Sequence, residues 1–179
     1  GIEALFNDVP VGTGVQVIDQ PIKIGWSAGE LYLEVYPEPE QADDAMRSFK
    51  AGHIIADDAP DTVAAFLKLL PYHQKLIHVR WSGEGAWVPL GDYQLKNGEQ
   101  LIGFENHTSH PSVGDVLFYP GGYSETEIIM AYGACSFSSK LGQLAGNHFL
   151  TIIEGQENLR ALGLKTLWEG AQDISFELD

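Results

Sequence analysis

One arginine stands out because this chain offers few cations with which to bind an anion. Arg80 is one of three arginines, with Arg47 and Arg160, and lies in a strand-like run between Val79 and Trp81. Strand alternation places Arg80 on the face opposite those two apolar neighbours. A guanidinium group suits a carboxylate, a phosphate or a polarised carbonyl. We therefore expect Arg80 either to anchor such a group or to form an ion pair with one of the 25 acidic residues.

The densest polar cluster runs over residues 105–110 and reads Glu-Asn-His-Thr-Ser-His. A carboxylate and an imidazole in one site can exchange protons with a ligand, so we predict acid–base roles for Glu105 and His110. The cluster's glutamate and histidines, together with His148, are also residue types that bind zinc or iron, but their spacing matches no strong metal motif. We therefore predict no metal ion and no cofactor. A polar loop that caps its own turns is the alternative.

Two glycine-containing segments offer backbone that a ligand can approach closely. Residues 120–122, Pro-Gly-Gly, lack the lysine of a phosphate loop and the third glycine of a dinucleotide motif, so nucleotide binding is disfavoured. Residues 142–148 end in an asparagine and a histidine, which either line a site or bond to their own turn. We predict that six residues contact the ligand: Trp81, Asn106, Tyr119, Glu125, Asn147 and His148.

The single cysteine, Cys135, is expected to be structural. It lies near Ala134 and Phe137, which favours a small buried hydrophobic residue over a nucleophile. One cysteine cannot form an internal disulfide, and this composition is typical of a reducing cytosol. No Gly-x-Ser-x-Gly motif supports a serine hydrolase.

The composition predicts one acidic globular domain. The chain has 179 residues, 44% of them hydrophobic, which is enough for a sizeable core. Ten Lys and Arg against 25 Asp and Glu leave a formal net charge of −15, which disfavours nucleic acid and anionic membranes as partners. No apolar run approaches the roughly 20 residues that span a bilayer. We expect a cytoplasmic protein whose partner is a small molecule. A homo-oligomer is neither required nor excluded.

Short strands and two helices must position these residues. A helix is predicted to begin at Pro60, among acidic residues, and to continue at apolar 3.6-residue spacing until Pro71. A second, weaker helix is predicted over residues 157–168. Strands are predicted over residues 23–26, 31–36, 49–55, 76–81, 86–90, 115–119, 127–132 and 148–154. This pattern predicts a mainly β fold with minor α content, a closed antiparallel barrel of about eight strands with two covering helices. Residues 1–21 would form an arm or edge strand, and residues 22–179 a single domain.

Several motifs resemble those of a known superfamily. Residues 58–62, Asp-Ala-Pro-Asp-Thr, followed by Phe66, are similar to a cyclophilin helix start. The second half is similar to a bacterial family of cyclophilin-like proteins of unknown function, and the resemblance extends over most of residues 22–168. The motifs are Glu105-Asn106-His107, His110-Pro111, residues 114–122, Glu125-Thr126-Glu127, Tyr132-Gly133 and residues 142–148. The resemblance implies a cyclophilin-like β-barrel and brings no activity with it.

Cyclophilins proper are peptidyl-prolyl isomerases, and their essential arginine follows an apolar-His run. Residues 77–81, Ile-His-Val-Arg-Trp, are the nearest match and place Arg80 at about that position. The Pro-Gly-Phe turn and the Gln-x-Gly-Gly segment of the isomerases are missing, since the chain continues Ser-Gly-Glu-Gly-Ala-Trp-Val-Pro. The resemblance therefore implies the barrel more than the isomerase activity.

We predict that the domain binds or transforms a small anionic or carbonyl-containing metabolite. If it is an enzyme, acid–base catalysis of an isomerase, lyase or hydrolase type on a small molecule is expected. Two alternatives stay open. One is a peptidyl-prolyl isomerase, in which Arg80 stabilises the twisted amide. The other is a non-catalytic protein-binding or assembly module with an apolar surface near Trp81 and Trp87.

Overall fold

The computed structural model describes residues 22–27, 30–35, 53–153 and 155–176, and these contain fourteen strands and two helices. The helices are α2 (Pro60–Leu67) and α3 (Gln156–Trp168). The main sheet contains β1 (Ile22–Ser27), β2 (Glu30–Val35), β3 (His53–Ile54), β4 (Tyr72–His78), β5 (Gly83–Gly91), β8 (His107–Thr108), β9 (Asp115–Tyr119), β10 (Thr126–Cys135), β13 (Gly146–Thr151) and β14 (Gln172–Phe176). Two small hairpins pair β6 (Lys96–Asn97) with β7 (Gln100–Leu101) and β11 (Ser138–Ser139) with β12 (Gly142–Gln143).

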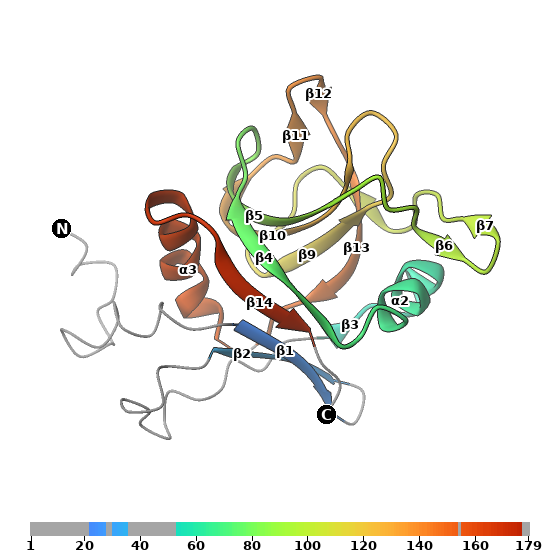
Figure 1. Ribbon diagram of the computed structural model, residues 1–179, viewed down its shortest axis with the longest axis horizontal. Coiled ribbons are helices and arrows are strands. Elements are labelled where there is room, and N and C mark those ends of the chain that lie inside the picture. Colours follow the sequence, from blue (N-terminus) through green and yellow to red (C-terminus); the bar gives the residue numbers. More distant parts are fainter. Residues whose placement is uncertain (1–21, 28–29, 36–52, 154, 177–179) are drawn as a thin grey trace.

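The ten main strands follow the order β3-β2-β1-β14-β4-β5-β10-β9-β13-β8 (Figure 1). An additional pairing of β3 with β13 joins the first strand of this order to the ninth. The expected mainly β fold with two helices is confirmed. The expectation of purely antiparallel pairing is wrong at one place, because β14 runs parallel to β1 while it pairs antiparallel with β4.

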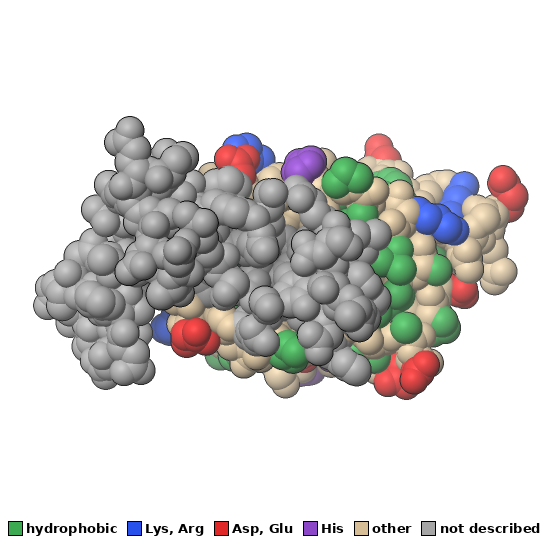
Figure 2. Space-filling model, turned by 90° about the horizontal axis from the view of Figure 1, so that it is seen from below, with side chains coloured by type: hydrophobic (Ala, Val, Ile, Leu, Met, Phe, Trp, Pro, Cys, Tyr) green, Lys and Arg blue, Asp and Glu red, His purple; other side chains and the backbone are tan. Residues whose placement is uncertain are grey.

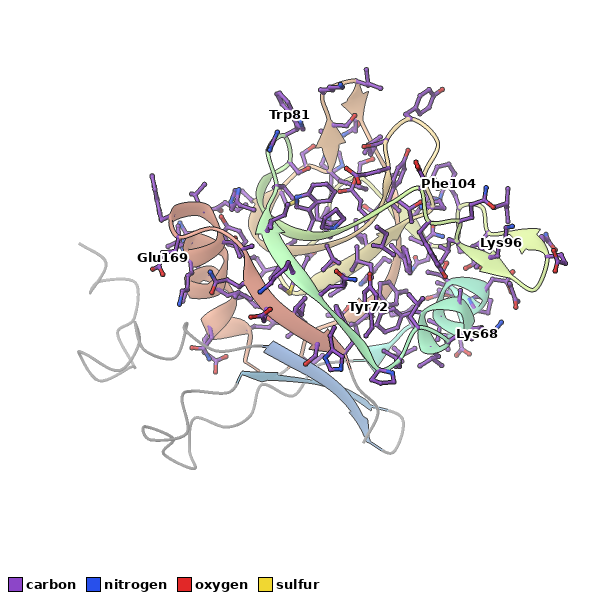
Figure 3. The ribbon with its side chains drawn as sticks, viewed as in Figure 1. Lys68, Tyr72, Trp81, Lys96, Phe104 and Glu169 are labelled. Carbon is purple, nitrogen blue, oxygen red and sulfur yellow. The ribbon has the colours of Figure 1, made fainter. Side chains whose placement is uncertain are left out.

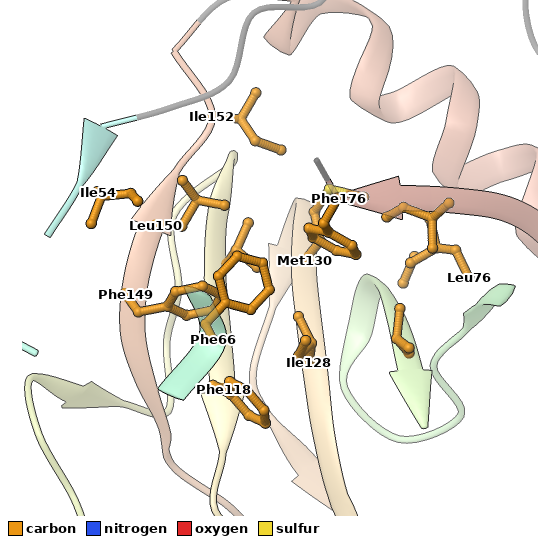
Figure 4. Packing of buried hydrophobic residues seen from close by; sticks show 14 of the residues in the cluster. Ile54, Phe66, Leu76, Phe118, Ile128, Met130, Phe149, Leu150, Ile152 and Phe176 are labelled. Atoms are coloured by element: carbon orange, nitrogen blue, oxygen red, sulfur yellow. The ribbon is translucent and has the colours of Figure 1, made fainter. Parts of the chain in front are cut away.

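Helix α2 begins where the sequence predicted, with Pro60 at its first turn, and ends at Leu67, before the expected end at Leu70. It buries Phe66 against the sheet, with ring centroids 4.8 Å from Phe149 and 5.3 Å from Phe176. Figure 4 shows these rings together inside the curved sheet. One face of α2 therefore closes the larger hydrophobic core, as its apolar spacing predicted.

Helix α3 covers the sheet at a different place from α2 (Figure 1). Its Gly163 lies directly against the ring of Tyr132 on β10, and a Cβ atom at this position would overlap that ring. An exposed ion pair adds a second link, since the Arg160 guanidinium lies 2.6 Å from a carboxylate oxygen of Glu84 on β5. The missing side chain at residue 163 thus sets how closely α3 approaches the sheet.

A second, smaller core cluster lies under the end of the sheet that carries the β11–β12 hairpin. Its buried residues are Val79, Leu117, Tyr119, Ile129, Phe137 and Leu144. Cys135 is partly buried against this cluster, and burial raises the pKa of its thiol to about 11. The thiol is therefore protonated at neutral pH, in agreement with the structural role expected for it.

The described surface carries charges of both signs. On the face shown in Figure 2, acidic and basic side chains are scattered, and those visible form no basic patch.

No helix in the described ranges is both long and apolar enough to cross a membrane. The predicted arm over residues 1–21, and most of the strand predicted over residues 49–55, lie outside the described residues.

Candidate functional site

A pocket of about 300 Å³ opens between the β4–β5 turn, the start of β10 and the β11–β12 hairpin. Its volume is at the small end of the range for ligand-binding sites, which suits a compact metabolite. The lining residues are Val79, Arg80, Trp81, Ser82, Trp87, Ser124, Glu125, Glu127, Ser138, Ser139 and Lys140. Three residues predicted from the sequence therefore meet here: Arg80, Trp81 and Glu125.

Arg80 follows β4 and does not lie within it. The strand ends at His78, so the expected strand alternation stops before Arg80, and the side chain is placed by a bend. The segment leading to it is fixed, because Val79 is buried and both ring nitrogens of His78 are engaged. One lies 2.6 Å from the Val79 carbonyl oxygen and the other 2.7 Å from the Tyr132 hydroxyl. A rigid base thus presents the exposed guanidinium at the pocket.

Four charged side chains line the pocket without pairing with one another. Arg80 and Lys140 are the cations, and Glu125 and Glu127 are the acids. Within the described part of the chain, none of the four forms a hydrogen bond through its side chain or an ion pair. Every nitrogen–oxygen distance between these cations and acids therefore exceeds 4.0 Å. Such an arrangement leaves the cations free to pair with a ligand.

Glu127 is the most unusual of the four. It lies near the start of β10, opposite Pro89 on β5 and Tyr119 on β9, and only 6% of the residue is exposed. Burial, and then the negative charge of Glu125, raise the pKa of the Glu127 carboxyl to about 8. The carboxyl is therefore mostly protonated at pH 7 and can donate a hydrogen bond.

Two tryptophans form contrasting parts of the pocket wall. Trp87 on β5 packs against the smaller core cluster, and its indole N–H is buried without a hydrogen-bond partner among the described residues. Trp81 is 60% exposed at the β4–β5 turn, where Figure 3 shows it at the end of the turn beside the β11–β12 hairpin. The pocket thus has an apolar inner wall and an exposed aromatic side chain at its mouth.

Glu105 and Asn147 lie elsewhere, where they hold the first turn of α2. The Glu105 carboxylate accepts hydrogen bonds from the Asp61 N–H at 3.2 Å, the Thr62 N–H at 2.8 Å and the Thr62 hydroxyl at 2.6 Å. The fully buried Asn147 accepts a bond from the Glu105 N–H at 3.0 Å and donates to Thr62 Oγ1 and the Gly103 carbonyl, each at 2.9 Å. These bonds satisfy N–H groups that a helix start leaves free.

His148 and Asn106 belong to a further polar group at the β13–β9 pairing. His148 Nε2 lies 3.2 Å from Asp115 Oδ1 and 2.8 Å from Thr151 Oγ1. Burial opposes ionisation of Asp115, but hydrogen bonds from His148, the Ser112 N–H and Thr151 outweigh it and lower the pKa of the Asp115 carboxyl. Asn106 donates to the His148 carbonyl at 3.0 Å from a backbone with a φ of 42°.

His110 and Tyr119 also lie outside the pocket wall. His110 is exposed and its Nε2 lies 3.4 Å from Nε2 of Gln143, on β12. Tyr119 is buried in the smaller core cluster, and its hydroxyl accepts a hydrogen bond from the Tyr123 N–H at 3.2 Å. The pocket therefore does not gather the predicted acid–base pair of Glu105 and His110 around Arg80. Their catalytic roles stay predictions.

Two of the charged residues in the pocket, Glu127 and Lys140, were not predicted from the sequence. Glu127 carried a usable signal, since it is an acid at the start of the apolar run Ile-Ile-Met-Ala-Tyr on a predicted strand. Lys140 carried none, because a lysine in a turn is ordinarily a solvated side chain. Among the described residues, no group of three or more His, Cys, Asp or Glu is placed to hold a metal ion.

Comparison with known proteins identifies a family and a relative that is similar over part of its length. The chain is 45% identical over 102 residues to the beta-hydroxyaspartate dehydratase of Paracoccus denitrificans (strain Pd 1222). That match covers 57% of this chain but only 31% of the dehydratase, so the chain spans about a third of that relative's length. The solved structure of McbB in complex with tryptophan aligns with a TM-score of 0.48 and 18% identity, over 69% of this chain and 38% of McbB. A family model matches residues 43–178, and the chain belongs to this family, DUF3830, whose function is unknown.

Proposed function

We propose that the pocket binds a small anionic or carbonyl-containing metabolite, most simply a carboxylate. Glu127 is the observation that carries this proposal. It is a buried carboxyl without a partner among the described residues, it lines the pocket, and its pKa of about 8 keeps it protonated at pH 7. A protonated carboxyl donates a hydrogen bond to a carboxylate or carbonyl oxygen, whereas an ionised one would repel an anion.

The balance of charge in the pocket supports an anionic ligand. With Glu127 protonated, Arg80 and Lys140 face only the negative charge of Glu125, so positive charge predominates locally. The whole chain has a formal net charge of −15. A local excess of unpaired cations on such a chain is best explained by a ligand that brings the missing negative charge. In this proposal the guanidinium of Arg80 holds a carboxylate through two parallel hydrogen bonds.

For the reaction we propose loss of water from a hydroxy carboxylate. Glu125 and Glu127 line one pocket in different protonation states, as an acid and a base require. The Glu125 carboxylate would take a proton from one carbon, while Glu127 gives its proton to the hydroxyl leaving from the next carbon. A carbon–carbon double bond forms, water departs, and solvent returns the proton from Glu125 to Glu127. The name of the partial relative, a dehydratase, supports this class of reaction.

We also propose that the main sheet closes into a cyclophilin-like barrel. The pairing of β3 with both β2 and β13 supports closure, since it makes a ring of paired strands. Action on a small molecule in the cytoplasm, as expected from the composition, is part of the same proposal.

Thermal shifts against a panel of small hydroxy, keto and unsaturated carboxylates test the binding proposal. A ligand at 100 times its Kd should stabilise the native state by about 2.7 kcal/mol. Arg80→Gln should abolish the shift. Lys96→Gln is the matched control, because it removes the same charge from the β6–β7 hairpin, well separated from Trp81 in Figure 3. A panel without a ligand, or a shift that survives Arg80→Gln, would contradict the proposal.

Turnover is tested separately by NMR, through the new carbon–carbon double bond formed from a simple hydroxy carboxylate, or through the keto acid and ammonium into which the enamine formed from β-hydroxyaspartate breaks down in water. Glu127→Gln should still bind the compound and lose turnover, because an amide donates a hydrogen bond but cannot give up a proton to a leaving group. Glu125→Gln should lose turnover as well. Turnover at the wild-type rate in either variant would remove that residue from the mechanism while leaving the binding proposal intact.

A further inference from the structure

We propose that the ligand carries a flat apolar substituent next to its carboxylate, and that Trp81 binds this substituent at the mouth of the pocket. This inference rests on the proposed function, since it presumes a carboxylate held by Arg80. It makes Trp81 a residue that determines substrate specificity. The substrate class would be an aromatic hydroxy or keto carboxylate.

Trp81 is largely exposed and lies outside both hydrophobic core clusters of the described residues. It contacts no other aromatic ring among these residues and leaves 60% of its surface exposed. Trp87 lines the same pocket but packs against the smaller core cluster, whereas Trp81 is exposed at the pocket opening. A large exposed indole at a pocket opening is suited to cover an apolar part of a ligand.

Two further exposed hydrophobic residues directly adjoin pocket-lining residues in the sequence. Tyr123 is 81% exposed and directly precedes Ser124 of the pocket wall, and Leu141 is 66% exposed and directly follows Lys140. With Trp81, they place a large apolar side chain on each of the three loops that form the pocket. The charged side chains that line the pocket and the exposed apolar side chains on its loops match a ligand that is anionic at one end and apolar at the other.

The order of residues along the chain also favours this arrangement. Trp81 directly follows Arg80, and both line the pocket. A carboxylate held by the guanidinium would therefore leave a substituent on the adjacent carbon within reach of the indole face. Flat aromatic rings gain most from such a face, because stacking adds to the removal of apolar surface from water. β-Hydroxyaspartate, the compound in the relative's name, has no ring and would use only the charged interior.

Isothermal calorimetry with two probes of equal charge tests this inference. Phenyllactate and lactate share the carboxylate and the hydroxyl, and they differ by one aromatic ring. We expect phenyllactate to bind about tenfold more tightly to the wild-type protein. Trp81→Ala should remove most of that difference, because it weakens phenyllactate binding far more than lactate binding, and Trp81→Phe should keep most of it. Trp168→Ala is the control, since Trp168 is 79% exposed at the end of α3 and does not line the pocket.

The outcomes separate this inference from the proposal on which it rests. Equal affinities for the two probes, or a preference that survives Trp81→Ala, would overturn the role of Trp81. Binding of both probes that Arg80→Gln abolishes would in that case leave the proposed function standing. Failure of both probes to bind, or binding unaffected by Arg80→Gln, would overturn both. A circular dichroism spectrum of each variant shows that loss of binding is not loss of the fold.

Discussion

At the residue scale, burial of Glu127 is unfavourable for folding, but it also keeps the carboxyl protonated so that it can bind a ligand. Only 6% of the Glu127 residue is exposed, and its carboxyl has no hydrogen-bond partner among the described residues, so burial and the negative charge of Glu125 oppose ionisation and raise its pKa to about 8. The same resistance keeps a proton available at neutral pH. Buried acids of this kind often mark functional sites, because a residue selected only for stability at this position would be apolar.

The stability of the protein should therefore fall with rising pH in a way that depends on Glu127. Between its ordinary pKa of 4.5 and about 8, the native state keeps the Glu127 proton while the unfolded chain releases it, so the free energy of unfolding decreases. Glu127→Gln removes this titration. In urea denaturation, the free energy of unfolding of Glu127→Gln should rise relative to that of the wild type by up to about 1.4 kcal/mol per pH unit over this window. The exposed Glu99→Gln serves as the control. An advantage of Glu127→Gln that does not change with pH would contradict the burial argument.

The sequence identified part of this pocket and could not identify the rest. Arg80, Trp81 and Glu125 were predictable because an arginine, an aromatic residue and an acid lie in segments that resemble those of a known family. Glu127 was missed although an acid beside an apolar strand run marks it, and its burial between strands β5 and β9, which lie far from it in sequence, could not be predicted. Lys140 reaches the pocket only through the path of the β11–β12 turn. Spacing along the chain does not reveal such contacts.

At the element scale, Glu105 fastens the start of α2. It accepts three hydrogen bonds from Asp61 and Thr62, so we expect Glu105→Ala to lower the free energy of unfolding by about 1–3 kcal/mol. Ligand binding in the Arg80 pocket should persist, and Glu99→Ala should be neutral. Chemical denaturation and calorimetry measure the two effects. A folded Glu105→Ala protein that no longer binds ligand would instead support the catalytic role predicted for Glu105 from the sequence.

Helix α3 offers a case in which packing outweighs helix propensity. Alanine favours a helix interior by about 1 kcal/mol over glycine. At residue 163, however, the added methyl group would overlap the ring of Tyr132, which is held by its hydrogen bond to His78. We expect Gly163→Ala to lower the free energy of unfolding by about 1–3 kcal/mol. Gly103→Ala, where an added Cβ meets nothing within 4 Å, is the control. A more stable Gly163→Ala protein in thermal denaturation would show that α3 is loosely packed.

Elements with a strong periodic pattern were predictable, and elements that depend on distant partners were not. The strand over residues 115–119 and the start of α2 at Pro60 agree with the structure. The last strand, β14, was missed because Gln-Asp-Ile-Ser-Phe is short and half polar, and it is stabilised by pairing with β1 and β4. β14 pairs in parallel with β1, which lies near the other end of the sequence. Local sequence does not encode a pairing between such distant segments.

At the scale of the whole molecule, a strongly acidic chain holds a pocket in which positive charge predominates. Segments from three places in the sequence bring Arg80, Lys140 and a protonated Glu127 together at one end of the sheet: the β4–β5 turn, the β11–β12 turn and the start of β10. Membership of a family of unknown function gives no activity with which to compare the site. Its chemistry must therefore be tested directly.

The most direct test is the pH dependence of ligand affinity. Calorimetry with a carboxylate from the panel, between pH 6 and pH 9, should show affinity constant at low pH. Above about pH 8 it should fall by up to tenfold per pH unit, as Glu127 ionises. Glu127→Gln should bind with an affinity that stays level across this range. Affinity that is constant in the wild type up to pH 9, or that falls equally in Glu127→Gln, would contradict the account.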